Sequence, residues 1–284
     1  MIGLKNFIRK LPYPIKKIFR DTYLKALDYK DQLIKKNIDL TPPRLLHRIG
    51  HGNYKIIGKR YCSHFINKCA LKQKDTVLDI GCGTGRMAVP LLNYLDGAAQ
   101  YIGFDISKKA IAWCQKNITS RNPNFRFYCS DIYNKEYNPR GKVAADQYKF
   151  LCKDDSVDLA IAVSVFTHMK PLEVLNYMKE IRRVLKPEGK ALLTFFIIDD
   201  NIDQHKGAPD GHYDFKYRFN DYFSIDNKIP EIAIGYRENV VQNLISEANL
   251  NIDEPIYYGC WSGRKSMLDF QDIIIVKKIN QVST

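Results

Sequence analysis

The stretch "VLDIGCGTGR" runs from Val77 to Arg86. Its apolar run ends at Asp79-Ile80, and three glycines follow at alternate positions: Gly81, Gly83 and Gly85. Glycine permits a tight turn and lets a ligand approach the backbone closely. A helix that begins after such a turn directs free N–H groups and the positive end of its dipole toward an anion. The stretch therefore predicts a strand, a glycine turn and a helix that together hold a small molecule.

A second acidic residue restricts what that molecule can be. Asp105 ends the apolar run "YIGFD", twenty residues after Gly85, and an acid there can accept hydrogen bonds from both hydroxyls of a ribose. The glycine spacing is G-x-G-x-G, whereas dinucleotide sites use G-x-G-x-x-G. Asp79 stands two residues before the first glycine, where a carboxylate suits a cationic amino group better than a pyrophosphate. S-Adenosylmethionine (SAM) has both an amino group and a ribose. We therefore expect Asp79 to face its ammonium group and the glycines to admit its methionine moiety.

These motifs resemble, in the same order, those of the class I SAM-dependent methyltransferases. "VLDIGCGTG" resembles their first motif, "GFDIS" (103–107) their second and "CSDI" (129–132) their third. "DDSVDLAIAVSVFTHM" and "LKPEGKALLTFF" resemble their fourth strand and the turn and strand after it. The resemblance covers residues 75–200 closely and the segments 1–70 and 199–235 only loosely. It implies an α/β fold, a doubly wound, Rossmann-like sheet of seven mostly parallel strands with an antiparallel last strand.

The resemblance also implies which residues hold SAM as the cofactor. Asp105 would bind the ribose, Asp131 would bond the adenine amino group and Ile132 would pack on the adenine ring. The expected cofactor residues are Asp79, Gly81, Gly83, Gly85, Asp105, Ile106, Asp131 and Ile132. No metal is expected in the site.

Strands and helices alternate along the chain, which is typical of parallel βαβ units. The expected strands cover residues 76–80, 101–105, 125–130, 157–164, 190–198, 252–258 and 271–277. The expected helices cover residues 86–94, 108–119, 172–185 and 237–248, and a further helix ends near residue 70. Residues 131–155 replace a helix by a loop, and residues 199–235 are an insertion with a hairpin arm that we expect to act as a lid. The predicted organisation is a basic helical cap and connector over 1–70, followed by a methyltransferase domain over 71–284.

His168 is the candidate general base. Methyl transfer from a sulfonium is an in-line displacement, so the protein mainly positions the acceptor and excludes water. An amine acceptor needs only to be neutral, whereas a hydroxyl must lose its proton to a base such as histidine. His168 follows the fourth expected strand in "SVFTHM", and ligands in open α/β sheets bind beyond the carboxyl ends of the strands. The alternative is that Thr167 and His168 merely cap the next helix.

The candidate acceptor residues come from the two caps and the last hairpin. In "GCWSGR" (259–264), Trp261 could wall an apolar pocket and Arg264 could pair with an anionic group. The alternative there is a tight hairpin with a solvated arginine. The further candidates are Tyr54, Tyr213, Tyr217, His51 and His212. Aromatic residues at alternating spacing are more often packing residues, and that interpretation stays open for the tyrosines.

The net charge of +13 raises the prior for an acidic partner, although a lysine-rich solvated surface explains it equally well. Many basic residues crowd the start of the chain, where an amphipathic helix begins near Ile15. We favour docking of that helix on the main domain over weak contact with a membrane surface. The seven cysteines have irregular spacing, which favours reduced thiols in a cytoplasmic protein. No apolar run has the length of a membrane helix, and the N-terminus is a poor signal peptide.

The sequence therefore predicts an enzyme that methylates oxygen or nitrogen of a polar small molecule, such as a sugar or a phosphorylated metabolite. An RNA or DNA methyltransferase is the first alternative, because the basic charge permits it. Against it, "AVSVFTHM" replaces the Asn/Asp-Pro-Pro-aromatic run of base-amino methylases, so no specific nucleic-acid partner is expected. A SAM-binding partner subunit without activity is the second alternative.

Overall fold

The computed structural model describes residues 21–30, 40–47, 53–198, 213–264 and 268–278. Its main sheet has seven strands in the order β10-β11-β5-β4-β1-β2-β3. The strands are β1 (Thr76–Ile80), β2 (Gln100–Asp105), β3 (Phe125–Cys129), β4 (Val157–Ala162), β5 (Leu185–Phe195), β10 (Leu250–Ile252) and β11 (Asp272–Lys278). The pairs from β5 to β3 are parallel, and β11 is antiparallel to both of its neighbours. The predicted seven-stranded, doubly wound sheet is confirmed.

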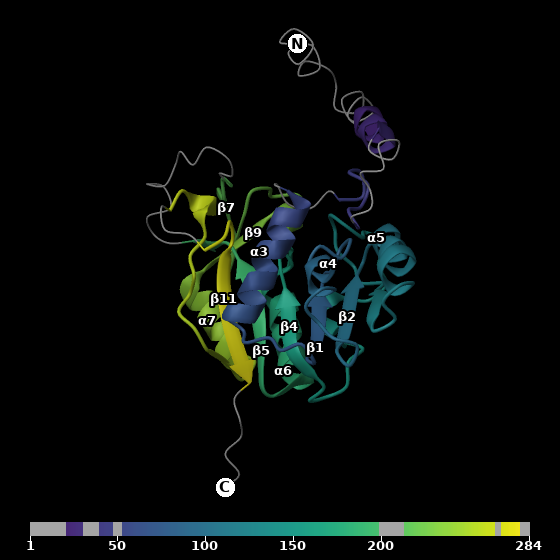
Figure 1. Cartoon of the computed structure of the whole chain (residues 1–284). Helices are drawn as coiled ribbons and strands as arrows, with labels where there is room; N and C mark the ends of the chain where they lie inside the picture. The colour runs from purple at the N-terminus through teal and green to yellow at the C-terminus, as the bar shows by residue number, and fades with distance from the viewer. Residues whose placement is uncertain (1–20, 31–39, 48–52, 199–212, 265–267, 279–284) are drawn as a thin grey trace.

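Helices cover both faces of the sheet (Figure 1). They are α3 (Tyr54–Asn67), α4 (Ala88–Leu91), α5 (Lys108–Cys114) with a π-helical turn (Gln115–Thr119), α6 (Pro171–Val184) and α7 (Glu238–Glu247). Successive strand residues point to opposite faces, so Leu78 packs in a cluster with α6 and α7, while Val77 packs in a cluster with α3, α4 and α5. Because helices cover both faces of the sheet, a site can form only where the strands end.

Three expected elements are shorter or differently placed, and each contains or adjoins a proline. The helix expected over 86–94 is only Ala88–Leu91, and Pro90 explains its late start because proline is tolerated only in a first helical turn. The strand expected over 252–258 is only Leu250–Ile252, because Pro255 cannot donate to a ladder. The strand expected from 190 begins at Leu185, since Pro187 disfavours helix at the preceding residue.

A second, four-stranded sheet extends from the carboxyl end of β5. Its order is β6-β9-β8-β7, with β6 (Ile197–Ile198), β9 (Ile234–Arg237), β8 (Phe223–Ser224) and β7 (Tyr217–Arg218). The antiparallel pair β7–β8 corresponds to the expected hairpin arm, although each strand has only two residues. We call these four strands the small sheet. Residues 199–212 of the predicted insertion lie outside the described residues, so its role as a lid stays a prediction.

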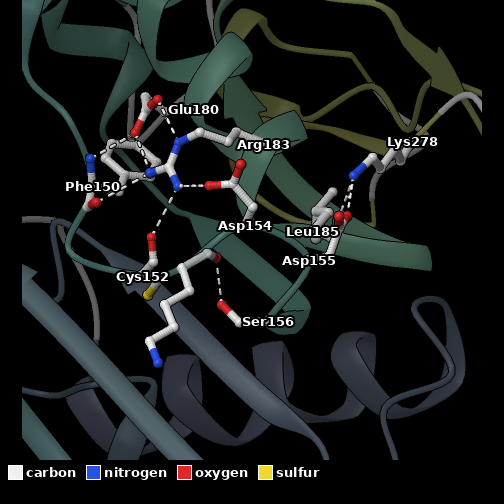
Figure 2. A network of polar contacts seen from close by, with 10 residues as sticks. Phe150, Cys152, Asp154, Asp155, Ser156, Glu180, Arg183, Leu185 and Lys278 are labelled. Atoms are coloured by element: carbon white, nitrogen blue, oxygen red, sulfur yellow. Dashed lines mark hydrogen bonds and ion pairs between the residues drawn. The ribbon is translucent and has the colours of Figure 1, made fainter.

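The loop over 131–155 is held by side chains of α6, among them Arg183 and Asn176, which donates to the Ala145 and Tyr148 carbonyls at 2.9 Å. Arg183 donates to both oxygens of Glu180 at 2.8 and 2.6 Å, to the Phe150 carbonyl at 3.1 Å and to the Cys152 carbonyl at 3.0 Å (Figure 2). A further bond of 2.6 Å joins it to Asp154. These charged partners raise the pKa of the guanidinium. Arg183 thus satisfies carbonyls that a helix would otherwise pair internally, which explains how the predicted loop is ordered.

Arg183→Met is expected to lower the free energy of unfolding by about 2 kcal/mol, because Glu180 and two carbonyls lose their donor. The measurement is urea denaturation of the variant and the wild type. Lys179→Met is the matched control, since the pair of Lys179 with Glu247 is exposed and exposed pairs contribute at most about 1 kcal/mol. Equal midpoints for the two variants would contradict this role of Arg183.

The N-terminal segment is described only in part. Residues 21–30 are helical, and Asp28 of this helix pairs with Arg44 at 2.7 Å. The basic residues 1–20 lie outside the described residues, so docking and membrane contact both stay predictions, as does the domain boundary near residue 70. None of the described helices is both long enough and apolar enough to cross a membrane. All seven cysteines lie in described segments and are free thiols.

Candidate active site

The three glycines of the turn have different physical reasons for being glycine. All have positive φ: +67° at Gly81, +52° at Gly83 and +73° at Gly85. A Cβ at Gly81 would lie 2.6 Å from Val165 Cγ2, and one at Gly85 would lie 2.8 Å from Ile118 Cδ1. A Cβ at Gly83 would meet no atom within 4 Å. Gly81 and Gly85 are therefore required for packing, whereas Gly83 borders the open space in which a ligand can approach the backbone.

This difference predicts separable effects of two alanine substitutions. Both cost about 1–2 kcal/mol for a side chain in the left-handed region. Gly83→Ala adds a methyl group only to the open space, so we expect SAM affinity to fall about tenfold or more. Gly85→Ala forces its methyl into Ile118, so we expect a larger loss of thermal stability. Calorimetric titration and thermal melts measure both effects, and a Gly83→Ala variant with unchanged SAM affinity would show that the cofactor does not use this space.

Asp105 joins the end of β2 to the glycine turn. Its Oδ2 accepts the Gly83 N–H at 2.8 Å and its Oδ1 accepts the Ser107 N–H at 2.7 Å. Burial raises the pKa of this carboxyl, and the backbone hydrogen bonds oppose that rise. An ionised carboxylate has about four acceptor positions. The backbone of Ile106 also bonds this carboxylate, so the three backbone partners leave acceptor capacity for a ribose hydroxyl. The geometry fits the predicted role.

Asp79 lies beneath the turn rather than in the open. Its carboxyl is only 2% exposed and accepts a hydrogen bond from the Tyr101 hydroxyl. Burial raises its pKa to about 7, the Tyr101 bond opposes the rise, and the neighbouring Asp105 adds to it. Contact between Asp79 and the cofactor ammonium stays a prediction.

The residues expected to bind the adenine, Asp131 and Ile132, follow the end of β3. This strand pairs with β2, and Cys129 lies opposite Asp105. Asp131 is exposed, and its main-chain carbonyl accepts the N–H groups of Lys142 and Val143 at 2.9 and 3.0 Å. Ile132 is 4% exposed and belongs to the core. Ile106 is half-buried at the edge of the same core.

The connector before α3 also reaches the glycine turn. The Tyr54 hydroxyl donates to the Thr84 carbonyl at 2.8 Å, and the His47 ring meets the Tyr54 ring edge-on at 4.6 Å. A Cβ at Gly58 would lie 2.6 Å from the Arg86 carbonyl, so α3 packs directly on the turn. The sequence assigns Tyr54 to the acceptor, whereas the structure puts it against the cofactor turn. His47 is absent from the sequence prediction, because nothing local to it indicates this contact.

His168 lies in a short 3₁₀ turn (Phe166–His168) after β4. Its Nδ1 is 2.9 Å from the Glu231 carbonyl oxygen, and because a carbonyl only accepts, Nδ1 carries the proton. In the neutral ring Nε2 then keeps a lone pair. Burial lowers the pKa of His168, and the backbone of Glu231 and Ile232 opposes that shift.

The helix-cap alternative for His168 does not hold. The N-cap of α6 is Lys170, and its main-chain N–H is bonded by Glu173 at 2.6 Å. Neither Thr167 nor His168 bonds the first turn of α6. The imidazole is therefore held by a segment far along the chain, not by the helix that follows it.

Comparison with known proteins assigns this architecture to a family. The family model described as "Methyltransferase domain" matches residues 77–189, the segment that holds the glycine turn, Asp105, Asp131 and His168. Residues 77–189 belong to the class I SAM-dependent methyltransferases. SAM is the cofactor of this family, and the open space at Gly83 and the acceptor positions of Asp105 fit it. When bound, SAM supplies an electrophilic methyl group on a sulfonium.

Among the relatives, the ubiquinone biosynthesis O-methyltransferase of Rickettsia akari is 30% identical over 152 residues, covering 53% of this chain and 50% of that protein. The chain spans about a quarter to a half of the length of the first curated relatives it matches. In fold it is similar to the PH0226 protein of Pyrococcus horikoshii, with a TM-score of 0.55, 19% identity and coverage of 82% of this chain and 94% of that one. It is also similar to an S-adenosylmethionine-dependent methyltransferase from Clostridium acetobutylicum, with a TM-score of 0.51 and 17% identity. That match covers 91% of this chain and 100% of the other. These structural likenesses show the fold alone.

The names of other relatives differ in the atom that is methylated. One is a sterol 4-C-methyltransferase of Caenorhabditis elegans, 27% identical over 61% of this chain and 46% of that protein. Another is a tRNA N(3)-cytidine methyltransferase of Gallus gallus, 25% identical over 41% of this chain and 29% of that protein. Relatives thus act on oxygen, carbon and nitrogen, so the family does not specify the acceptor of this methyltransferase domain.

Two predicted acceptor residues have structural partners. Asp272 is fully buried, and its Oδ2 accepts from Trp261 Nε1 at 2.6 Å while Arg264 donates to Oδ1 at 3.1 Å. Burial raises the pKa of Asp272 to about 6, and these donors oppose the rise. A buried carboxylate requires such partners. Trp261 is 1% exposed and packs in a buried cluster with Phe196 and Phe215. It therefore does not form the wall of an open pocket. Contact of either residue with the acceptor stays a prediction.

The remaining acceptor candidates lie at the small sheet. Tyr213 is half-buried against Phe196, with ring centroids 4.7 Å apart, and Tyr217 is half-buried in β7. His51 and His212 lie outside the described residues. The sequence prediction misses Tyr137, whose ring meets the His168 ring edge-on at 5.2 Å. Tyr137 is 42% exposed, and the desolvation of its hydroxyl raises the pKa to about 12.

Proposed function

We propose that this chain transfers the methyl group of SAM to oxygen or nitrogen of a polar small molecule, such as a sugar or a phosphorylated metabolite. The observation that carries the proposal is the His168 ring, held after β4 with its proton on Nδ1 and a lone pair on Nε2. Val165, which packs against Gly81, is only three residues before His168. A base in that place is close to where the methyl group of SAM would be presented.

The chain's own residues divide the work in this proposal. The glycine turn, Asp105 and Tyr54 hold the cofactor, and Asp131 supports its adenine. His168 accepts the proton of a hydroxyl acceptor at Nε2 as the oxygen attacks, and for an amine acceptor it only positions the nitrogen. The aromatic side chains at the small sheet exclude water from the acceptor.

A polar or anionic acceptor is favoured by the charge around the small sheet. Its exposed basic side chains are Lys216, Arg218 and Arg237. The guanidinium groups of Arg218 and Arg237 lie 6.0 and 5.8 Å from the centre of the Phe223 ring. Planar guanidinium groups bind carboxylates and phosphates in a bidentate manner.

The test is a screen of acceptors for release of S-adenosylhomocysteine, followed by the mass of the product. Sugars, sugar phosphates, phenols and amines form the panel, and RNA is included as the competing class. We expect turnover on a polar small molecule and only weak, salt-sensitive RNA binding. Selective methylation of RNA at physiological salt would replace the proposal. A chain that binds SAM but turns over no acceptor would favour a SAM-binding partner subunit.

A further inference from the structure

The His168 ring is held by one residue from the turn between β8 and β9. Glu231 lies in a 3₁₀ turn (Pro230–Ile232), and its main-chain carbonyl oxygen is 2.9 Å from His168 Nδ1. The Oε1 atom of the same residue is 2.9 Å from Lys170 Nζ. Lys170 is two residues after His168. Glu231 therefore bonds twice to one short segment, once through its backbone and once through its side chain.

The Glu231 carboxylate depends on Lys170. Its side chain is 2% exposed, and its Oε2 has no hydrogen-bond partner among the described residues. Removing the cation from a buried pair leaves an uncompensated charge, which is strongly destabilising in place. Glu173 and Tyr222 also face Lys170, but they add no positive charge. Loss of Lys170 would therefore drive Glu231, and the carbonyl it carries, away from its present position.

Two neighbouring contacts fix the rest of the segment without touching the imidazole nitrogens. The Tyr236 hydroxyl donates to the Met169 carbonyl, and Asn134 Nδ2 donates to the His168 carbonyl at 3.2 Å. These bonds hold the main chain on either side of Lys170. The 3₁₀ turn of Glu231 has backbone bonds of its own, from the Ile232 N–H to the Ile229 carbonyl at 3.1 Å and from the Ala233 N–H to the Pro230 carbonyl at 3.3 Å. The ion pair adds a side-chain link between this turn and the segment that carries His168.

We propose that Lys170 and Glu231 are positioning residues for His168. Their ion pair holds the Glu231 carbonyl against Nδ1, which keeps the proton on Nδ1 and leaves Nε2 as the acceptor nitrogen. The tautomer part of this inference concerns the chain alone. Its consequence for catalysis rests on the proposed function, in which Nε2 takes the proton of a hydroxyl acceptor.

The direct test is long-range ¹H–¹⁵N NMR of the imidazoles in the full chain without acceptor, above the pKa of His168. We expect the wild type to show the Nδ1–H tautomer, Lys170→Met to show a mixture, and Lys170→Arg to restore the wild-type pattern. Lys179→Met is the control, because it removes an exposed lysine pair from the same helix. If Lys170→Met fails to fold, Glu231→Gln removes the charge at nearly the same volume and is expected to give the same mixture.

The kinetic test uses the hydroxyl acceptor identified by the screen. We expect Lys170→Met to lower kcat about tenfold, the scale of one lost hydrogen bond, with an unchanged KM for SAM. The fall of the rate at acid pH should also move to lower pH in this variant. The Nδ1–H bond to the Glu231 carbonyl favours the protonated ring, so weakening that bond lowers the pKa of His168. The groups that face that ring are the backbone of Glu231 and Ile232 and the ring of Tyr137.

Two results would overturn the inference: an Nε2–H tautomer in the wild type, or a tautomer ratio in folded Lys170→Met and Glu231→Gln equal to that of the Lys179→Met control. Failure of the proposed function has a different signature. It would appear as the absence of turnover by the wild type on every acceptor, while the NMR result stays measurable.

Discussion

His168→Ala is expected to lower kcat on a hydroxyl acceptor by about 10²–10⁴-fold while leaving SAM affinity nearly unchanged. That range is the usual contribution of a general base. The expectation rests on the Nε2 lone pair that the bond between Nδ1 and the Glu231 carbonyl leaves available. Steady-state kinetics with saturating SAM and calorimetric titration of SAM measure the two quantities separately.

The pH dependence gives a second, independent check on His168. Burial lowers the pKa of this imidazole below its ordinary value of about 6.5. A protonated ring cannot accept a proton, so the rate should fall as pH drops through that lowered pKa and should be constant above it. The His168→Ala variant should lack this acid limb. An amine acceptor could produce a limb by its own deprotonation, so the comparison between variant and wild type is decisive.

Thr167→Val is the matched control for His168. Thr167 is fully buried in the same turn, and its hydroxyl has no hydrogen-bond partner among the described residues. The substitution keeps the volume and should keep both the rate and the limb. If His168→Ala turned over a hydroxyl acceptor at the wild-type rate, the base would have to be sought elsewhere, first among His47 and the tyrosines around the site.

Asp105→Ala is the second substitution with a large expected effect, a loss of SAM affinity of about 2–4 kcal/mol. The cofactor would lose its ribose acceptors, and hydrogen bonds to a charged group contribute about 1.5–3 kcal/mol each. The Gly83 N–H and the Ser107 N–H would also lose their common partner, which would loosen the turn. Calorimetric titration of SAM and S-adenosylhomocysteine measures the loss.

A matched control separates the loss of cofactor contacts from the loss of a structural carboxylate. Asp96 also accepts two backbone N–H groups, from Ala98 at 2.8 Å and Ala99 at 3.2 Å, but before β2 begins. Asp96→Ala should lower thermal stability and leave SAM affinity unchanged. Equal affinity losses in the two variants would mean that Asp105 acts only through the stability of the fold.

Local sequence predicts the sheet because each signal acts over a few residues. The buried strand of "VLDIGCGTG", the glycines after it and the acid that ends β2 all lie within thirty residues. Their order predicts parallel pairing and a cofactor at the carboxyl ends of the strands. The family model covers this same segment. The differences in element bounds also have local causes that are visible in the sequence. Pro255 lacks the N–H of a strand ladder, and the rings of Pro90 and Pro187 restrict helix by steric clash.

Only part of the site can be predicted from short stretches of sequence. The glycine positions are predictable, but which glycine borders open space depends on Val165 and Ile118, which come from other elements. Arg264 has the sequence pattern of an anion-binding residue, yet its bond to the buried Asp272 is formed only in the fold. A charged residue in a loop gives no local sign of whether its partner is a ligand or another part of the chain.

Sequence patterns alone predict the order of the cofactor motifs, the class of the sheet and the place of His168 after the fourth strand. The fold is needed to see that His168 bonds the Glu231 carbonyl, 63 residues further along the chain, that Tyr54 bonds the glycine turn and that His47 packs on Tyr54. The physical reason is the range of the interactions. Helix, strand and turn preferences act between neighbours in sequence, whereas the proton position on an imidazole is set by whichever group the completed fold places against it.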